Sequence, residues 1–264
     1  MIQSDFGKVA EHYARSRNDI PNIFFESLLL RNIMLEGKKT VDIGCGTGVL
    51  TRKLKLRHAD VVGVDPSVEM LEKAMEASEK ERLQIPYFSG TAEATGLESG
   101  TFDIVTAMRA WHWFNREPAI REVKRILRPG GTFIVADSAF IPSHSVTDVT
   151  FEVLEKYTEN GLEPAGSKAE SRQRINGFPV EWFEEWHNHG FQFRDFYRLD
   201  YEVTFTNQSW VERIASVSWL ADMDKETRLA ALQELKNRLN EQYAEDAVHT
   251  IDHYCSVCIL RLSK

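Results

Sequence analysis

A glycine-rich stretch near the amino end reads Val41-Asp42-Ile43-Gly44-Cys45-Gly46-Thr47-Gly48. Its apolar start predicts a short strand over residues 40–43, and its glycines predict a loop over residues 44–48. Glycine lets a backbone approach a ligand without a Cβ in the way, and the helix expected over residues 49–57 begins with amide groups that face the same space. The stretch therefore predicts a ligand site at the carboxyl end of a strand.

Strands and helices alternate outward from this stretch as far as residue 137. Further strands are expected over residues 61–64, 85–89, 102–107 and 132–137, with helices from Ser67 and from about Glu117, and a tight turn at Arg128-Pro129-Gly130-Gly131. This alternation predicts an α/β fold with a doubly wound, mostly parallel sheet. Beyond residue 137 we expect helices, a strand near residues 198–205 and a closing strand that carries Cys255 and Cys258.

Composition and charge exclude several classes of protein. Lys and Arg total 32 against 40 Asp and Glu, a net charge of −8, so a nucleic-acid partner is not expected. No segment reaches the run of about 18 apolar residues that spans a membrane, and the first residues lack a signal-peptide pattern, so we expect a cytoplasmic protein with no membrane partner. Cys255 and Cys258 have no second pair at zinc-finger spacing, and no metal site is expected.

Asp65 stands at the tip of the second predicted strand. A carboxylate there can accept hydrogen bonds from two ribose hydroxyls, the general arrangement for a cofactor that contains adenosine. A cap for the helix that Pro66 and Ser67 begin is an alternative role for it. The dinucleotide fingerprint Gly-x-Gly-x-x-Gly is not met, because Val49 holds its third glycine position.

With this spacing the chain resembles the class I S-adenosylmethionine-dependent methyltransferases, in particular the type 11 branch of small-molecule enzymes. The matches run in order from the glycine loop through Val-Gly-Val-Asp-Pro-Ser, Gly90-Thr91-Ala92-Glu93, Thr101-Phe102-Asp103-Ile104-Val105 and Arg-Ile-Leu-Arg-Pro-Gly-Gly. The resemblance implies a Rossmann-like fold with a seven-stranded sheet and S-adenosyl-L-methionine as the cofactor. It further implies a set of cofactor-binding residues: Tyr13, Arg17, Asp42, Gly44, Cys45, Gly46, Asp65, Pro66, Thr91, Ala92, Glu93, Ala107 and Arg109.

The expected roles of Thr91 and Arg17 each have an alternative. Family members often have Asp where this chain has Thr91, whose hydroxyl is a weaker acceptor for the adenine amino group, so recognition there would rest more on the backbone of Ala92. Tyr13 and Arg17 resemble the family's N-terminal segment that folds over the cofactor. Arg17 would then hold the methionine carboxylate, and an exposed helical arginine is the alternative.

We expect the chain to form a single methyltransferase domain over residues 1–264. Residues 1–39 form an N-terminal helical segment, residues 40–137 a cofactor-binding half, and residues 138–264 an acceptor-side half. Helical insertions near residues 140–178 and 206–245 are expected to build a lid over the acceptor.

The aromatic segment Arg109-Ala110-Trp111-His112-Trp113-Phe114 follows the fourth predicted strand. Ligands of doubly wound sheets bind beyond the carboxyl ends of the strands, so Trp111, His112 and Trp113 are expected to contact the acceptor. The segment resembles the His-Trp-Phe segment of the branch that includes trans-aconitate methyltransferase. His112 is the candidate catalytic base, and a buried histidine with satisfied hydrogen bonds is the alternative.

The sequence therefore predicts an S-adenosylmethionine-dependent methyltransferase that acts on a small molecule, at a carboxylate, a hydroxyl or an activated carbon. A carboxylate acceptor needs no base, whereas the others profit from one. Three alternatives stay open: a methyltransferase acting on a macromolecule, an oxidoreductase with a nucleotide cofactor, and a cofactor-binding protein without catalysis.

Overall fold

The computed structural model describes residues 20–142, 145–158, 161–162, 164–221 and 223–263. They form two compact units. One, here called the sheet unit, comprises residues 20–138, 166–199 and 255–264; the other, here called the helical unit, includes residues 139–165 and 200–254. The expected division of the chain into a cofactor-binding half and an acceptor-side half stays a prediction.

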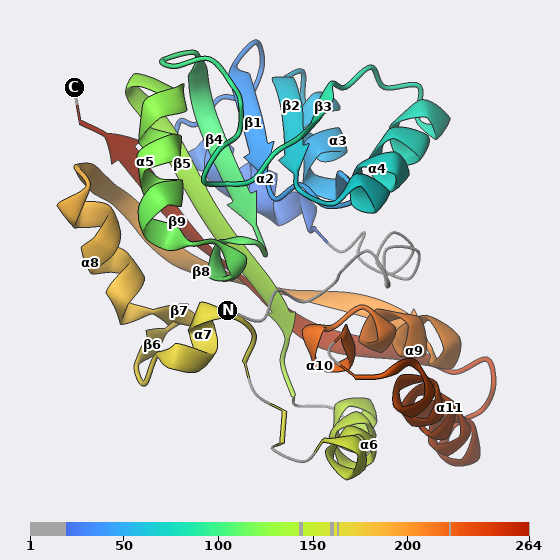
Figure 1. Ribbon diagram of the computed structural model, residues 1–264. Helices are drawn as coiled ribbons and strands as arrows, with labels where there is room; N and C mark the ends of the chain where they lie inside the picture. Colours follow the sequence, from blue (N-terminus) through green and yellow to red (C-terminus); the bar gives the residue numbers. More distant parts are fainter. Residues whose placement is uncertain (1–19, 143–144, 159–160, 163, 222, 264) are drawn as a thin grey trace. The chain divides into compact units, whose positions relative to one another are not determined.

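A seven-stranded sheet with the strand order β3-β2-β1-β4-β5-β9-β8 carries the fold (Figure 1). Its strands are β1 (Lys39–Ile43), β2 (Asp60–Asp65), β3 (Tyr87–Ser89), β4 (Phe102–Met108), β5 (Leu127–Phe140), β8 (Phe191–Thr206) and β9 (Val248–Leu262). The pairs β1–β2, β1–β4, β2–β3 and β4–β5 are parallel. The doubly wound, mostly parallel sheet expected from the sequence is confirmed.

Helices cover both faces of the strands in the sheet unit, and Figure 1 shows α5 in front of the sheet and α2 behind it. These helices are α2 (Asn22–Leu30), α3 (Val49–Lys55), α4 (Val68–Lys80), α5 (Arg116–Ile126), α7 (Ser167–Glu170) and α8 (Val180–Asn188), with the 3-10 turn η2 (Trp111–Trp113) and the short strands β6 (Arg174–Ile175) and β7 (Phe178–Pro179) between them. Trp182 and Trp186 of α8 are buried in one core with Phe133 of β5, as their spacing predicts.

The expected turn at residues 128–131 is wrong in detail. β5 begins at Leu127 and includes these residues, and its register against β4 shifts between Phe102 and Ile104. Gly130 has a φ of 75°, which only glycine adopts without cost, so the chain bends inside the strand instead of turning before it.

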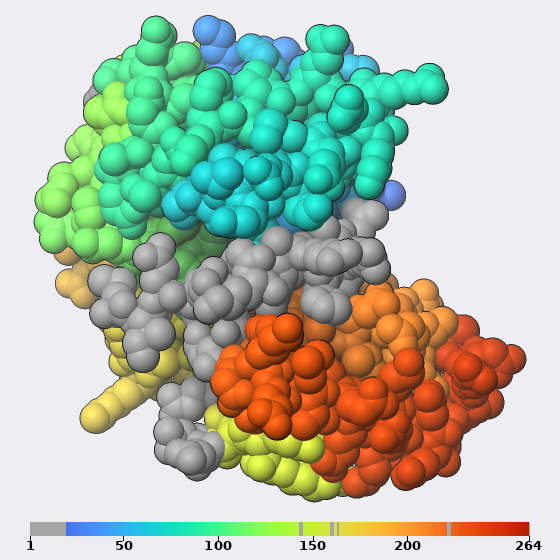
Figure 2. Space-filling model, turned by 45° about the vertical axis from the view of Figure 1, so that its right-hand side comes forward, coloured from blue at the N-terminus to red at the C-terminus, as the bar shows by residue number. Residues whose placement is uncertain are grey.

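The helical unit has its own core. Its helices are α6 (Ser145–Leu154), η3 (Glu155–Tyr157), α9 (Asn207–Ala215), α10 (Ser218–Ala221) and α11 (Lys225–Gln242). Figure 2 shows α6 in yellow-green alongside the orange and red helices, and α6 contacts α11. Trp210 is fully buried there and donates from Nε1 to the Thr150 hydroxyl at 2.8 Å. No helix in the described ranges is long and apolar enough to cross a membrane.

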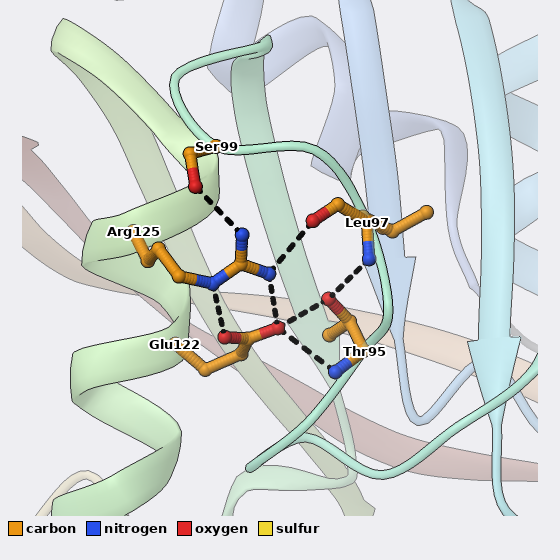
Figure 3. Close-up of polar contacts among 5 residues, drawn as sticks. All are labelled: Thr95, Leu97, Ser99, Glu122 and Arg125. Carbon is orange, nitrogen blue, oxygen red and sulfur yellow. Dashed lines mark hydrogen bonds and ion pairs between the residues drawn. The ribbon is translucent and has the colours of Figure 1, made fainter.

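A hydrogen-bond network fixes the loop between β3 and β4 onto α5 (Figure 3). The Glu122 carboxylate accepts from the Thr95 amide at 2.8 Å and from the Arg125 Nε at 2.7 Å. Arg125 in turn donates to the Ser99 hydroxyl and to the Leu97 carbonyl. Arg125 and then Thr95 hold the pKa of Glu122 at about 2 against the opposing effect of burial. The network holds in place the loop that begins with Thr91 and Ala92.

We expect Glu122→Gln to lower the free energy of unfolding by about 1 to 3 kcal/mol near neutral pH, since it removes a buried carboxylate that pairs with Arg125. Because the pKa of Glu122 is depressed, its contribution is complete above the ordinary value of 4.5 and is lost as the pH falls through about 2. The difference between wild type and variant should shrink over that window. Urea titrations at several pH values measure it.

Glu117→Gln is the matched control on the same helix. Glu117 pairs with Arg121, and both side chains are more than half exposed, so its loss should cost less than about 0.5 kcal/mol. Equal losses for the two variants would contradict the role given to the buried network.

Candidate functional site

The glycine loop at the carboxyl end of β1 is tied to β2 by its own backbone. The amides of Gly44 and Cys45 donate to the Val64 carbonyl at 2.8 and 3.1 Å, and the Gly46 amide donates to Oδ2 of Asp65 at 2.8 Å. Gly44, Gly46 and Gly48 have φ values of 67°, 53° and 71°. This left-handed region is open to glycine and costly for other residues. The glycines are therefore required by the path of the chain.

Asp65 ends β2 and faces this loop. Its Oδ1 accepts from the Ser67 amide at 3.0 Å, whereas the cap of α4 is the Ser67 hydroxyl, which accepts from the Met70 amide. Burial raises the pKa of Asp65, and the amides of Ser67 and Gly46 oppose the rise. A carboxylate can accept about four hydrogen bonds, and the two amides leave capacity for hydroxyl donors. Asp65 thus supports the turn before α4 without filling the cap position itself.

Asp42 lies inside the protein. It is 1% exposed, and its two carboxylate oxygens accept from the hydroxyls of Thr51 at 2.7 Å and Thr106 at 2.9 Å. Burial raises the pKa of Asp42 to about 6, against the effect of the two threonines. Asp42 therefore links β1, which leads into the glycine loop, to α3 and β4. In this structure its carboxylate is buried away from any ligand.

The segment expected to meet the adenine follows β3. Thr91 is exposed, Ala92 is buried, and the Glu93 carboxylate accepts from the Asn115 amide at 2.7 Å. The Gly90 amide donates to the Asp65 carbonyl at 3.2 Å, which places this segment beside the end of β2. Pro66 is exposed at the same end of β2.

The aromatic segment after β4 packs directly on the glycine loop. A Cβ added to Gly44 would lie 2.7 Å from the Ala110 Cβ and 3.0 Å from the Phe114 ring. Arg109 has a φ of 56° and donates from its amide to the Ala136 carbonyl at 2.8 Å, which turns the chain at the end of β4. Ala107, two residues before Arg109, is buried in the core. The two segments singled out from the sequence therefore touch.

Within the aromatic segment the side chains take different places. Trp111 is 1% exposed and packs in the core against Phe133, with ring centroids 5.3 Å apart, and against Trp186. Trp111 would have to leave this core to contact an acceptor. Its place in the sequence did not indicate that the side chain is buried. Trp113 is half-buried, and its ring centroid lies 4.9 Å from that of His112.

His112 has two neighbours that the sequence did not single out. Its Nδ1 lies 4.0 Å from Oδ2 of Asp137, and Lys168 makes an ion pair with the same carboxylate oxygen. The three side chains are 9%, 14% and 18% exposed. The signal available in the sequence was the position of Asp137, an acidic residue at the end of the fifth predicted strand; nothing in the sequence pointed to Lys168.

Tyr13 and Arg17 lie outside the described residues, so their expected contacts with the cofactor stay predictions. Across the ranges that the structure describes, no three His, Cys, Asp or Glu side chains gather as they would around a metal ion.

The sequence of this chain is similar to those of known methyltransferases. Residues 41–135 match the family model described as a methyltransferase domain. Over these residues the chain is similar to the methyltransferases of that family. An uncharacterized methyltransferase of Mycobacterium tuberculosis is 39% identical over 126 residues, which cover 48% of this chain and 49% of that protein. A ubiquinone biosynthesis O-methyltransferase of Methylococcus capsulatus is 37% identical over 100 residues, 37% of this chain and 42% of that protein. The chain spans about half the length of the curated relatives it matches.

Solved structures share the fold of this chain. A putative type II methyltransferase from Anaeromyxobacter dehalogenans has a TM-score of 0.62 at 18% identity, covering 92% of this chain and 96% of that one. A phosphoethanolamine N-methyltransferase of Haemonchus contortus, solved with S-adenosylhomocysteine, has a TM-score of 0.55 at 19% identity, covering 100% of this chain and 58% of that one. The narrower resemblance to the trans-aconitate branch stays a prediction.

The contact between the two segments can be tested at Gly44. We expect Gly44→Ala to lower both the melting temperature and the affinity for S-adenosylhomocysteine, because the new Cβ must push Ala110 and Phe114 away. Gly37→Ala is the matched control: its φ of 68° gives the same backbone strain of roughly 1–2 kcal/mol, but nothing lies within 4 Å of the new Cβ. Calorimetry and thermal melts that give the two variants the same properties would contradict this account.

Proposed function

We propose that this protein transfers a methyl group from S-adenosylmethionine to a small-molecule acceptor. The observation that carries the proposal is the gathering, at the carboxyl ends of β1, β2 and β4, of the glycine loop, the Asp65 carboxylate and the His112 segment in one unit. Ligands of doubly wound sheets bind at this edge.

The residues at this edge fit the cofactor. Asp65 keeps acceptor capacity for two ribose hydroxyls, and the half-buried Gly44 and Gly46 have no side chain to block the methionine portion. The exposed Thr91, next to buried Ala92, can meet the adenine. When bound, S-adenosylmethionine supplies an activated methyl group on a sulfonium. The protein's part is to align the acceptor with that group and to exclude water.

Charge and relatives support a small acceptor. With 40 acidic against 32 basic residues the chain does not favour the phosphate backbone of a nucleic acid. Among the relatives are enzymes named for ubiquinone biosynthesis and for malonyl-[acyl-carrier protein], both O-methyltransferases. Of the acceptor classes expected from the sequence, hydroxyls and carboxylates are those that O-methylation serves. A cytoplasmic location stays a prediction.

The function is tested by measuring S-adenosylhomocysteine formation against a panel of carboxylic acids, phenols, amines and compounds with activated carbon. We expect turnover with at least one class and none with nucleic acid or protein. Turnover only with a macromolecule would overturn the small-molecule assignment. Binding of NAD in place of S-adenosylmethionine would favour an oxidoreductase, and cofactor binding without turnover on any acceptor would favour a non-catalytic role.

Cofactor binding is tested separately at Asp65. We expect Asp65→Ala to weaken S-adenosylhomocysteine binding by about 1 to 3 kcal/mol, or roughly 5- to 150-fold in Kd, through loss of charge-assisted hydrogen bonds. Asp60, at the opposite end of the same strand, is exposed, so Asp60→Ala should leave Kd unchanged. Titration calorimetry that finds wild-type affinity in Asp65→Ala would leave Asp65 only its role in the turn before α4.

A further inference from the structure

His112, Asp137 and Lys168 form a polar cluster at the edge of an apolar core. Asp137 follows Phe133 and Val135 on alternate positions of β5, so it continues the face that these two residues bury. Lys168 reaches it from α7, and His112 reaches it from η2 with Nδ1 4.0 Å from Oδ2. All three residues belong to the sheet unit.

A glycine brings the lysine into this cluster. Gly166 has a φ of 56°, and a Cβ there would lie only 2.2 Å from the backbone oxygen of His112. α7 can therefore begin against the backbone of η2 only because residue 166 is glycine. The left-handed backbone at Gly166 lets α7 begin beside η2, and α7 places Lys168 beside Asp137.

Stability gives a weak reason for this arrangement. Removing an ammonium and a carboxylate from water costs several kcal/mol per ion, and apolar residues of similar size often serve a fold equally well. A charged pair held beside a histidine, next to the glycine loop, is more typical of a site where a proton is handled.

We propose that Asp137, held by Lys168, orients the His112 imidazole with its proton on Nδ1, so that Nε2 accepts the proton released by the acceptor. The proposal rests on the proposed function and narrows its substrate class. The acceptor is then a hydroxyl, an amine or an acidic carbon, which lose a proton on methylation, and not a carboxylate, which has none to lose at neutral pH.

The two charged residues have separate tasks. The carboxylate accepts from Nδ1–H and thereby selects the tautomer, a task for which 4.0 Å is one ångström too long in the unliganded protein. Such contacts commonly shorten when the substrate binds. The Lys168 ammonium offsets the charge of the carboxylate, so that Asp137 orients the imidazole without placing a net negative charge beside it.

The acceptor atom forms a bond to the methyl carbon while the carbon–sulfur bond breaks and its electron pair goes to sulfur. The acceptor's proton goes to Nε2 of His112, so the positive charge of the sulfonium ends on the imidazolium. Loss of that proton to water restores the neutral base. Asp137 and Lys168 take part only by holding His112.

The test reads the tautomer of His112 directly. Nitrogen-15 labelling of the histidines gives separate NMR signals for Nδ1 and Nε2, and His112→Gln identifies those of His112 by their loss. Near neutral pH, with S-adenosylhomocysteine added so that the site is filled, we expect protonated Nδ1 and unprotonated Nε2. Asp137→Asn should shift the population toward the other tautomer. Asp195→Asn, which breaks the ion pair between Asp195 and Arg31 in the same unit, should leave the signals unchanged.

The outcomes separate this proposal from the broader one. A His112 in wild type that carries its proton on Nε2 or on both nitrogens would overturn it, as would unchanged signals in Asp137→Asn. If that variant does not fold, Lys168→Met serves instead, and it should drive His112 toward the imidazolium because the carboxylate is no longer offset; unchanged signals would again overturn the proposal. Absence of turnover on every acceptor would refute the proposed function while leaving the NMR result intact.

A kinetic measurement completes the test once an acceptor is known. Asp137→Asn should lower kcat about 10-fold or more with a hydroxyl, amine or carbon acceptor, and the KM for S-adenosylmethionine should stay unchanged. Wild-type kcat in this variant, or a carboxylate as the best acceptor, would contradict the assignment.

Discussion

The hydrogen bond from the Gly46 amide to the Asp65 carboxylate is the interaction on which the rest of the site depends. With the bonds from Gly44 and Cys45 to the Val64 carbonyl, it fixes the loop after β1 against the end of β2. Since β1, β2 and β4 are parallel, their carboxyl ends meet at one edge, and every further part of the site is placed relative to that loop.

The carboxylates of Asp42 and Glu122 are both buried, but their pKa values are shifted in opposite directions, by burial at Asp42 and by Arg125 at Glu122. Burial raises the pKa of Asp42 to about 6, because the hydroxyls of Thr51 and Thr106 and the backbone of Thr51, which oppose the rise, are all uncharged donors. Glu122 receives a guanidinium as well as Thr95, so its pKa falls to about 2. The protonated form of Asp42 therefore stabilises the fold, and this contribution is complete below pH 3.8 and is lost as the pH rises through about 6. The ionised form of Glu122 stabilises the fold, and that contribution is lost as the pH falls through about 2.

The sequence predicted those features that are written in short stretches. The glycine loop, the first five strands and the core positions of Trp182 and Trp186 follow from local spacing, and the structure has them. Trp111 was expected to contact the acceptor, yet it packs in the core, because the sharp turn at Arg109 directs it inward and its neighbour His112 toward β5. Spacing within one segment does not fix such directions.

The partners of His112 could not be predicted for another reason. Asp137 and Lys168 come from separate parts of the chain, and their meeting depends on the backbone of Gly166 lying against η2. Contacts between residues distant in sequence follow from the packing of elements, which neither composition nor periodicity describes. Asp42 is a similar case: its place before the glycines suggested a ligand contact, whereas the strand buries it between Thr51 and Thr106.

A crystal structure of the protein with S-adenosylhomocysteine would show whether the cofactor binds at this edge of the sheet. We expect ribose oxygens within hydrogen-bond distance of Asp65, the methionine portion along Gly44 to Gly46, and the sulfur facing the segment that carries His112. A ligand bound at another edge of the sheet, or with its ribose away from Asp65, would contradict this placement.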